Sequence, residues 1–135
     1  MRKDLNILIV EDEPDLREVF SEMLRMLGCE VSEASNGKQA LLELKSKKFD
    51  ALFTDLQMPE MDGTALINAI YELKLHTYPQ IFVMTGRIDK DPRSEMKSCV
   101  AELVKSILPK PFSYRQIADL LQTSFTTSSL AKQKE

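Results

Sequence analysis

Short apolar runs alternate with longer amphipathic stretches along most of the chain. Five of these runs predict strands, at residues 5–10, 29–34, 49–54, 81–84 and 106–108. The first run is rich in β-branched side chains and is bounded by charge, which is typical of a strand buried on both faces. The second alternates apolar and polar positions, which indicates a strand nearer the edge of a sheet.

Each predicted strand precedes a stretch with helical periodicity. Pro14 suits the first turn of the first helix, and apolar residues recur there at spacings of three and four until Gly28, a natural helix end. Further helices are expected over about residues 37–48 and 64–74. The last helix is expected to begin after Ser113, which would act as its N-cap.

A fourth helix is expected to open at Asp91-Pro92. Its inward face would be made by Met96, Cys99, Val100 and Leu103. Cys99 and Cys29 are the two cysteines, and no CxxC pair exists, so a zinc or redox motif is not expected. We predict that both are reduced, small core residues of a cytoplasmic protein.

The order of strand then helix, repeated five times, predicts an α/β fold. We expect a doubly wound, five-stranded parallel sheet of flavodoxin-like type, with strand order 2-1-3-4-5 and helices on both faces. The length of 135 residues fits one domain, which we place at residues 1–123. Residues 124–135 are polar and unpatterned, and we expect a mobile tail there and no output domain.

The charge balance narrows the function classes. The net charge of −3 is mildly acidic, which argues against non-specific binding to nucleic acid or to an anionic membrane. The apolar runs are all shorter than the roughly 20 residues of a membrane span, and the N-terminus lacks the pattern of a secretion signal. We therefore expect a cytoplasmic protein whose partners are neither nucleic acid nor membrane.

Polar residues stand where four of the predicted strands end. Glu11 and Asp12 follow the first strand, Asp55 ends the third, Thr85 ends the fourth, and Lys110 follows the fifth. Taken alone, each has an ordinary explanation as a helix cap, a turn residue, loop chemistry or a solvated lysine. Together they would meet in one cleft, because ligand sites in open α/β sheets lie beyond the carboxyl ends of the strands.

This set of residue types suits phosphoryl transfer. Crowded carboxylates repel one another and need a cation, and hard oxygen ligands favour Mg²⁺. A carboxylate beside Mg²⁺ can attack phosphorus and form an aspartyl-phosphate. The ammonium of Lys110 and the hydroxyl of Thr85 would then stabilise the charge on the phosphoryl oxygens.

The sequence resembles the receiver domain of bacterial two-component response regulators, of the single-domain, chemotaxis-regulator-like kind. The resemblance covers about residues 4–123. It is carried by four motifs in order, "ILIVEDEPDLRE", "FTDLQMPEMDG", "FVMTG" and "LPKPF".

The resemblance implies a role for each matching residue. Asp55 matches the phosphoacceptor, Glu11 and Asp12 match the acidic pair that organises Mg²⁺, and Gln57 would lend its backbone carbonyl to the metal. The phosphoryl donor would be a sensor histidine kinase or a histidine phosphotransfer domain. The protein would then be a signalling phosphoacceptor, not an enzyme acting on external substrates, and a monomer or weak homodimer.

The phosphoryl side of the site is implied in the same way. Thr85 matches the switch hydroxyl, Lys110 matches the lysine that pairs with the phosphoryl group, and the Lys110–Pro111 bond is expected to be cis. Phosphorylation would signal through a shift of the fourth helix, fifth strand and fifth helix, and so change binding to a downstream protein.

Some positions depart from the family pattern. Ile107 stands where receivers often carry an aromatic switch residue, and the connection at residues 87–93 looks longer than usual. We therefore expect an altered region around the fourth helix, suited to a particular partner. We also predict that Gln57 and Arg87 modulate the lifetime of the aspartyl-phosphate.

Other interpretations remain open at this stage. The chain could be a stand-alone receiver or the excised receiver of a larger regulator or hybrid kinase. A binding module of the same fold that is never phosphorylated is a second class, although the intact acidic set argues against it. A phosphatase with an aspartate nucleophile is a third, but such enzymes usually carry a second aspartate at the position that Gln57 occupies.

Overall fold

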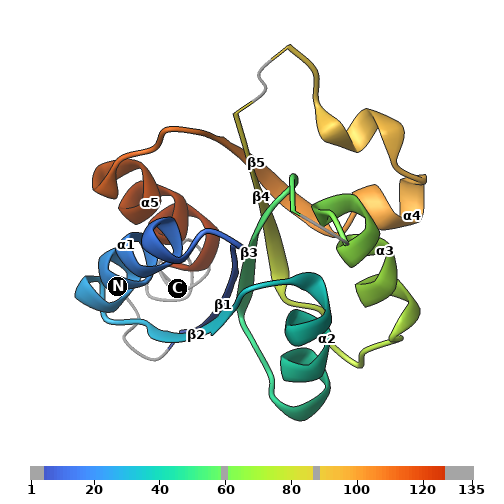
Figure 1. Ribbon diagram of the computed structural model, residues 1–135, viewed down its shortest axis with the longest axis horizontal. Helices are drawn as coiled ribbons and strands as arrows, with labels where there is room; N and C mark the ends of the chain where they lie inside the picture. Colours follow the sequence, from blue (N-terminus) through green and yellow to red (C-terminus); the bar gives the residue numbers. More distant parts are fainter. Residues whose placement is uncertain (1–4, 59–60, 87–88, 127–135) are drawn as a thin grey trace, which may run out of the picture.

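The five strands form a single parallel sheet at the centre of the protein (Figure 1). This computed structural model describes residues 5–58, 61–86 and 89–126. The strands are β1 (Asn6–Val10), β2 (Glu30–Ala34), β3 (Ala51–Asp55), β4 (Gln80–Thr85) and β5 (Val104–Pro109). Their order is β2-β1-β3-β4-β5, so the predicted doubly wound fold and its strand order are confirmed.

Helices cover both faces of the sheet (Figure 1). They are α1 (Pro14–Met26), α2 (Gly37–Ser46), α3 (Gly63–Glu72), α4 (Ser98–Ala101) and α5 (Tyr114–Leu121). Helices α1 and α5 lie on one face, and α2, α3 and α4 lie on the other. Each face has its own apolar core, because successive residues of a strand point to opposite sides.

The core under α1 and α5 is built around aromatic side chains. The rings of Phe53 on β3 and Phe82 on β4 stack with their centroids 4.8 Å apart. Phe20 of α1 meets Phe53 edge-on at 5.0 Å. Such edge-to-face and offset contacts suit the aromatic quadrupole and add to the stabilisation from buried area. They fix α1 against the strand that ends at Asp55.

Most helix boundaries follow the signals in the sequence. Asn36 and Asp62 cap α2 and α3 by accepting hydrogen bonds from the backbone N–H three residues on. Ser113 and Gln116 form a reciprocal capping box at the start of α5. Gly28 follows α1 with φ of 92°, a left-handed conformation that favours glycine.

The predicted continuous fourth helix is wrong. Residues Pro92–Glu95 form a separate 3₁₀ turn, Met96 and Lys97 are extended, and α4 is a single turn. The turn closes on itself because Asp91 accepts from the backbone N–H of Arg93 and pairs with its guanidinium at 2.8 Å. Local side-chain bonds of this kind compete with helix propagation.

The break in this region changes the environment of Cys99. Val100 is buried and Met96 packs partly against the core, as predicted, but Cys99 is exposed. The prediction of a core cysteine therefore holds for Cys29 and is wrong for Cys99. A one-turn helix can bury only one narrow face, and Val100 occupies it.

The end of the described chain continues α5. Residues Gln122–Thr126 form a π-helical turn, and Phe125 packs partly against the core under α1 and α5. The predicted tail covers residues 124–135, and its part from residue 127 onward lies outside the described residues. No helix among the described residues combines the length and apolar character that a membrane crossing requires.

Candidate functional site

The carboxyl ends of four strands bring the predicted polar residues together. Glu11 directly follows β1, Asp55 is the last residue of β3, Thr85 is the last of β4, and Lys110 directly follows β5. In the register of the sheet, Asp55 lies beside Met84 of β4. The strand ends therefore deliver these side chains to one edge of the sheet from rigid elements.

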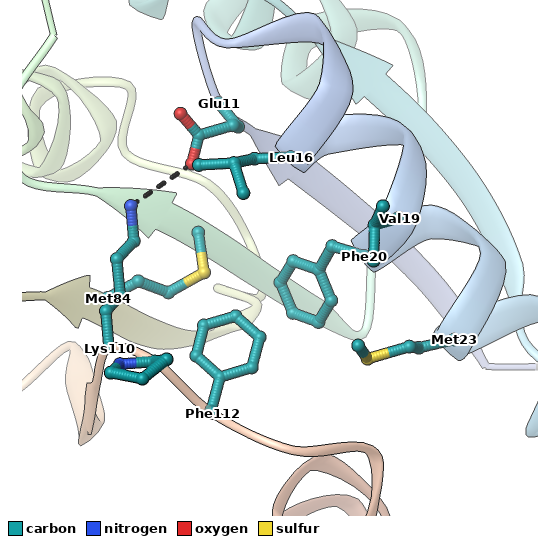
Figure 2. Close-up of a pocket in the computed structure, with 9 residues that line it drawn as sticks. Glu11, Leu16, Val19, Phe20, Met23, Met84, Lys110 and Phe112 are labelled. Atoms are coloured by element: carbon teal, nitrogen blue, oxygen red, sulfur yellow. Dashed lines mark hydrogen bonds and ion pairs between the residues drawn. The ribbon is translucent and has the colours of Figure 1, made fainter.

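Lys110 links two of the carboxylates. Its Nζ lies 2.7 Å from Asp55 Oδ2 and 3.4 Å from Glu11 Oε1. The second contact is the dashed line in Figure 2. The backbone N–H of Lys110 donates to the carbonyl of Thr85 at 2.7 Å, which fixes the start of the β5–α5 connection against β4. The Lys110–Pro111 bond is cis, as expected.

Three carboxylates form an acidic cluster, made by Glu11, Asp12 and Asp55. One oxygen from each can be chosen so that all three lie within 4.8 Å of one another. Glu11 and Asp55 are buried, whereas Asp12 is exposed. The alternative that Asp12 merely caps the first helix is not supported, because the N-cap of α1 is Glu13.

Burial and neighbouring charges shift the pKa values in this cluster. Burial raises the pKa of Glu11, and the charge of Asp55 adds to this, against opposing effects from the Glu13 N–H and from Lys110. For Lys110, burial alone would lower the pKa. The hydrogen bond to Asp55 and the two carboxylate charges outweigh burial, so the pKa of Lys110 is raised. The lysine is thus held as a cation.

The connection after β3 is held tightly around Asp55. The backbone N–H of Gln57 donates to Asp55 Oδ1 at 3.2 Å, and the N–H of Gly63 donates to the carbonyl of Leu56 at 2.8 Å. Gln57 itself is exposed beside the site. The metal-binding role of its carbonyl and its effect on phosphate lifetime stay predictions, and Arg87 lies outside the described residues.

Two residues near the site were not singled out from the sequence. Gly63 packs directly on the peptide after Asp55, and the Asp62-Gly63 pair was the only local signal for it. Arg17 of α1 donates from Nη1 to the carbonyl of Glu11 at 2.8 Å. A lone arginine on a helix gives no sign of such a contact in the sequence.

Thr85 and Ile107 define the side of the site toward β5. Thr85 is buried at the end of β4, and Ile107 of β5 pairs with Val83 in the sheet. Ile107 is partly buried and packs against the core under α2, α3 and α4. An aliphatic side chain thus occupies the position at which receivers often carry an aromatic switch residue.

An apolar groove opens beside Lys110, between α1 and the β5–α5 connection (Figure 2). Its volume is about 420 Å³. The rings of Phe20 and Phe112, which both line it, pack against each other in a tilted arrangement with centroids 5.1 Å apart. Leu16 and Val19 of α1 line it and are 45% and 52% exposed, so they present an apolar pair to solvent one helical turn apart.

Comparison with known proteins decides the family. Residues 7–122 match the response regulator receiver domain. The chain belongs to this family. Receiver domains are the phosphoacceptor modules of two-component systems, where they work in phosphorelay with sensor kinases, and the predicted family is therefore confirmed.

One curated relative and one solved structure show how closely this receiver follows the family. A response regulator receiver protein of Anaeromyxobacter sp. (strain Fw109-5) is 35% identical over 113 residues, which are 84% of this chain and 45% of that protein. The chain thus spans less than half of that curated relative. A CheY-like receiver domain from Methylobacillus flagellatus matches with a TM-score of 0.75 and 28% identity, over 88% of this chain and 97% of that one.

A second solved structure bears on the metal. The receiver domain of sensor histidine kinase PA1611 from Pseudomonas aeruginosa PAO1 has a magnesium ion coordinated in its active-site cleft. It matches with a TM-score of 0.77 and 28% identity, over 89% of this chain and 96% of that one. The acidic cluster of the present receiver offers the hard oxygen donors that Mg²⁺ prefers, so its residues fit such an ion.

Proposed function

We propose that this receiver accepts a phosphoryl group on Asp55, and that Mg²⁺ is held there by Glu11, Asp12, Asp55 and the carbonyl of Gln57. One observation carries the proposal. Asp55, at the end of a buried strand, contacts Lys110 at 2.7 Å and shares a cluster with two more carboxylates. A nucleophile, a cation and a metal-ligand set therefore stand within reach of one phosphoryl group.

The transfer step assigns a role to each side chain. One carboxylate oxygen of Asp55 attacks phosphorus and forms an O–P bond, while the N–P bond of a donor phosphohistidine breaks. The electron pair leaves on the imidazole nitrogen, which takes a proton from solvent. Mg²⁺, when bound, supplies neutralisation of charge on the phosphoryl oxygens. Lys110 then pairs with a phosphoryl oxygen in place of Asp55, and the Thr85 hydroxyl donates to another.

The donor is a sensor histidine kinase or a histidine phosphotransfer domain, and the apolar groove supplies its docking surface. Leu16 and Val19 are exposed on α1 within the same groove that Glu11 and Lys110 line. Such an apolar pair suits the apolar face of a helix on the donor, which would bring its phosphohistidine to Asp55. The phosphorylated receiver then signals by binding a further protein through its α4, β5 and α5 region.

Intact mass after incubation with Mg²⁺ and acetyl phosphate tests the phosphoacceptor. We expect one labile phosphoryl group on the wild type, and none on Asp55→Asn or on wild type treated with EDTA. Equal labelling of wild type and Asp55→Asn would place the phosphate elsewhere and contradict the proposal. Beryllofluoride binding with Mg²⁺ would separate a poor small donor from an inactive site.

Val19→Glu tests the docking surface separately. The donor for this test is a histidine phosphotransfer domain that labels the wild type. A charge at position 19 should lower the rate of transfer from that donor by about tenfold or more. The reaction with acetyl phosphate should be unchanged, because that donor needs no docking. Leu42→Glu is the control, since Leu42 is 66% exposed on α2, away from the groove. Equal slowing with both donors would show damage to the site itself.

A further inference from the structure

Arg17 joins three parts of the protein beside the acidic cluster. Its Nη1 donates to the backbone carbonyl of Glu11 at 2.8 Å, and its Nε lies 3.2 Å from Glu33 Oε1. Glu33 belongs to β2, Arg17 to α1, and Glu11 to the connection between β1 and α1. One guanidinium therefore ties that connection to the neighbouring strand.

The β1–α1 connection carries much of the acidic cluster, so its backbone position matters for the site. It carries Glu11 and Asp12, two of the three clustered carboxylates, within the three residues between β1 and α1. The N–H of Glu11 donates to Ala34 at 3.1 Å, and the N–H of Glu13 donates to Glu11 Oε2 at 3.2 Å. The second bond engages a carboxylate that the metal would also use. Arg17 instead holds the backbone and leaves both carboxylates available.

Glu33 orients the guanidinium of Arg17. Its other oxygen, Oε2, lies 3.3 Å from Nη2 of Arg25, so the carboxylate stands between two arginines of α1. The planar fork of arginine allows Nε to pair with Glu33 while Nη1 reaches the Glu11 carbonyl. A lysine has a single compact ammonium and cannot make both contacts with this geometry. Arg25 shares Glu33 but has no such bond to the connection among the contacts described.

We propose that Arg17, oriented by Glu33, is a positioning residue for the acidic pair. It fixes the Glu11 carbonyl, and with it the peptide that directs the Asp12 carboxylate toward Asp55. The inference rests on the proposed Mg²⁺ site. Groups that orient metal ligands from outside the coordination sphere typically change metal affinity by 10–100-fold when they are lost.

Arg17→Lys tests the inference with the charge preserved, and Arg25→Lys is its matched control. In metal-free protein, amide hydrogen exchange at Glu11 and Glu13 should become faster in Arg17→Lys and stay at the wild-type rate in Arg25→Lys. Calorimetric titration with MgCl₂ should show about tenfold weaker binding in Arg17→Lys only. Glu33→Gln, which weakens the orientation of Arg17, should give a smaller loss of the same kind.

Urea unfolding of each variant separates positioning from general stability. Equal loss of stability in both lysine variants, with Mg²⁺ affinity weakened only in Arg17→Lys, would support the positioning role. Unchanged exchange at Glu11 and Glu13 in Arg17→Lys would overturn it. If the wild type fails to bind Mg²⁺, the proposed function falls, and the exchange rates still decide whether Arg17 holds the acidic segment.

Discussion

Gly63 lies in close contact with the backbone of Asp55 and Leu56. A Cβ atom at this position would lie 2.6 Å from the Asp55 carbonyl oxygen and 2.8 Å from Leu56 Cα. Both are backbone atoms of the segment that carries the proposed phosphoacceptor, so they cannot move aside without moving Asp55. The close approach of two chain segments, and not an unusual φ, therefore requires glycine here.

Gly63→Ala should destabilise the protein by about 2 kcal/mol, because overpacking against backbone forces a shift of both segments. It should also slow labelling of Asp55 by acetyl phosphate. Gly86→Ala is the matched control for stability, since a Cβ there meets nothing within 4 Å among the described residues. Urea unfolding compares the two. Similar stability of both variants would show that the loop relaxes freely.

Replacing Ser21 is expected to stabilise the protein, in contrast to the loss of stability expected at Gly63. It lies on the buried face of α1, and its Oγ has no hydrogen-bond partner among the described residues. A buried hydroxyl without a partner costs about 1–3 kcal/mol, and alanine is also the better helix former. Ser21→Ala should therefore raise the free energy of unfolding by about 1 kcal/mol. A clear loss of stability in urea unfolding would reveal a partner for the hydroxyl.

Among the elements, the region between β4 and β5 is the one that departs most from its predicted form. The 3₁₀ turn, the extended residues and the single turn of α4 replace one longer helix. This region lies next to β5, through which the proposed output is transmitted. A segment of short pieces with few buried side chains needs less free energy to rearrange than a continuous helix packed along its length.

The exposure of Cys99 tests this arrangement. Burial raises the pKa of the Cys29 thiol and removes it from solvent, so it should stay inert in the native state. Titration with a thiol reagent such as DTNB should modify one cysteine rapidly in folded protein and two in urea. Cys99→Ser should abolish the rapid phase, whereas Cys29→Ser should retain it. Slow modification of both cysteines in folded protein would instead support a continuous fourth helix with Cys99 on its inward face.

Local sequence patterns predict some parts of this fold and its candidate site and not others. The strands and the site residues Glu11, Asp55, Thr85 and Lys110 were predictable, because apolar runs mark parallel strands and parallel strands share one carboxyl edge. The break before α4 was not, since it depends on how Asp91 and Arg93 bond to each other. Arg17 was missed for a related reason, because its partner Glu33 lies 16 residues away on another element.

At the scale of the whole molecule, the site concentrates negative charge that the fold must tolerate. Glu11 and Asp55 are buried near each other, and the raised pKa of Glu11 reflects this burial and repulsion. A group whose folded pKa is raised adds stability at low pH and loses it as pH rises through that pKa. At neutral pH the metal-free receiver therefore holds the Glu11 carboxylate at a cost, whereas the ion pairs that raise the pKa of Lys110 act in the opposite direction.

Mg²⁺ should relieve this cost and stabilise the fold. Ligand that binds only the native state stabilises it by about 2.7 kcal/mol at 100 times its Kd, so the Tm should rise with MgCl₂. Asp12→Asn should remove most of this rise, because it removes one carboxylate charge from the cluster while keeping the shape of the side chain. Asp15→Asn is the matched control, since it removes the same charge from an exposed position in the first turn of α1. A rise that both variants lose equally would indicate general screening of charge, whereas loss in Asp12→Asn alone would tie the stabilisation to a bound ion at the acidic cluster.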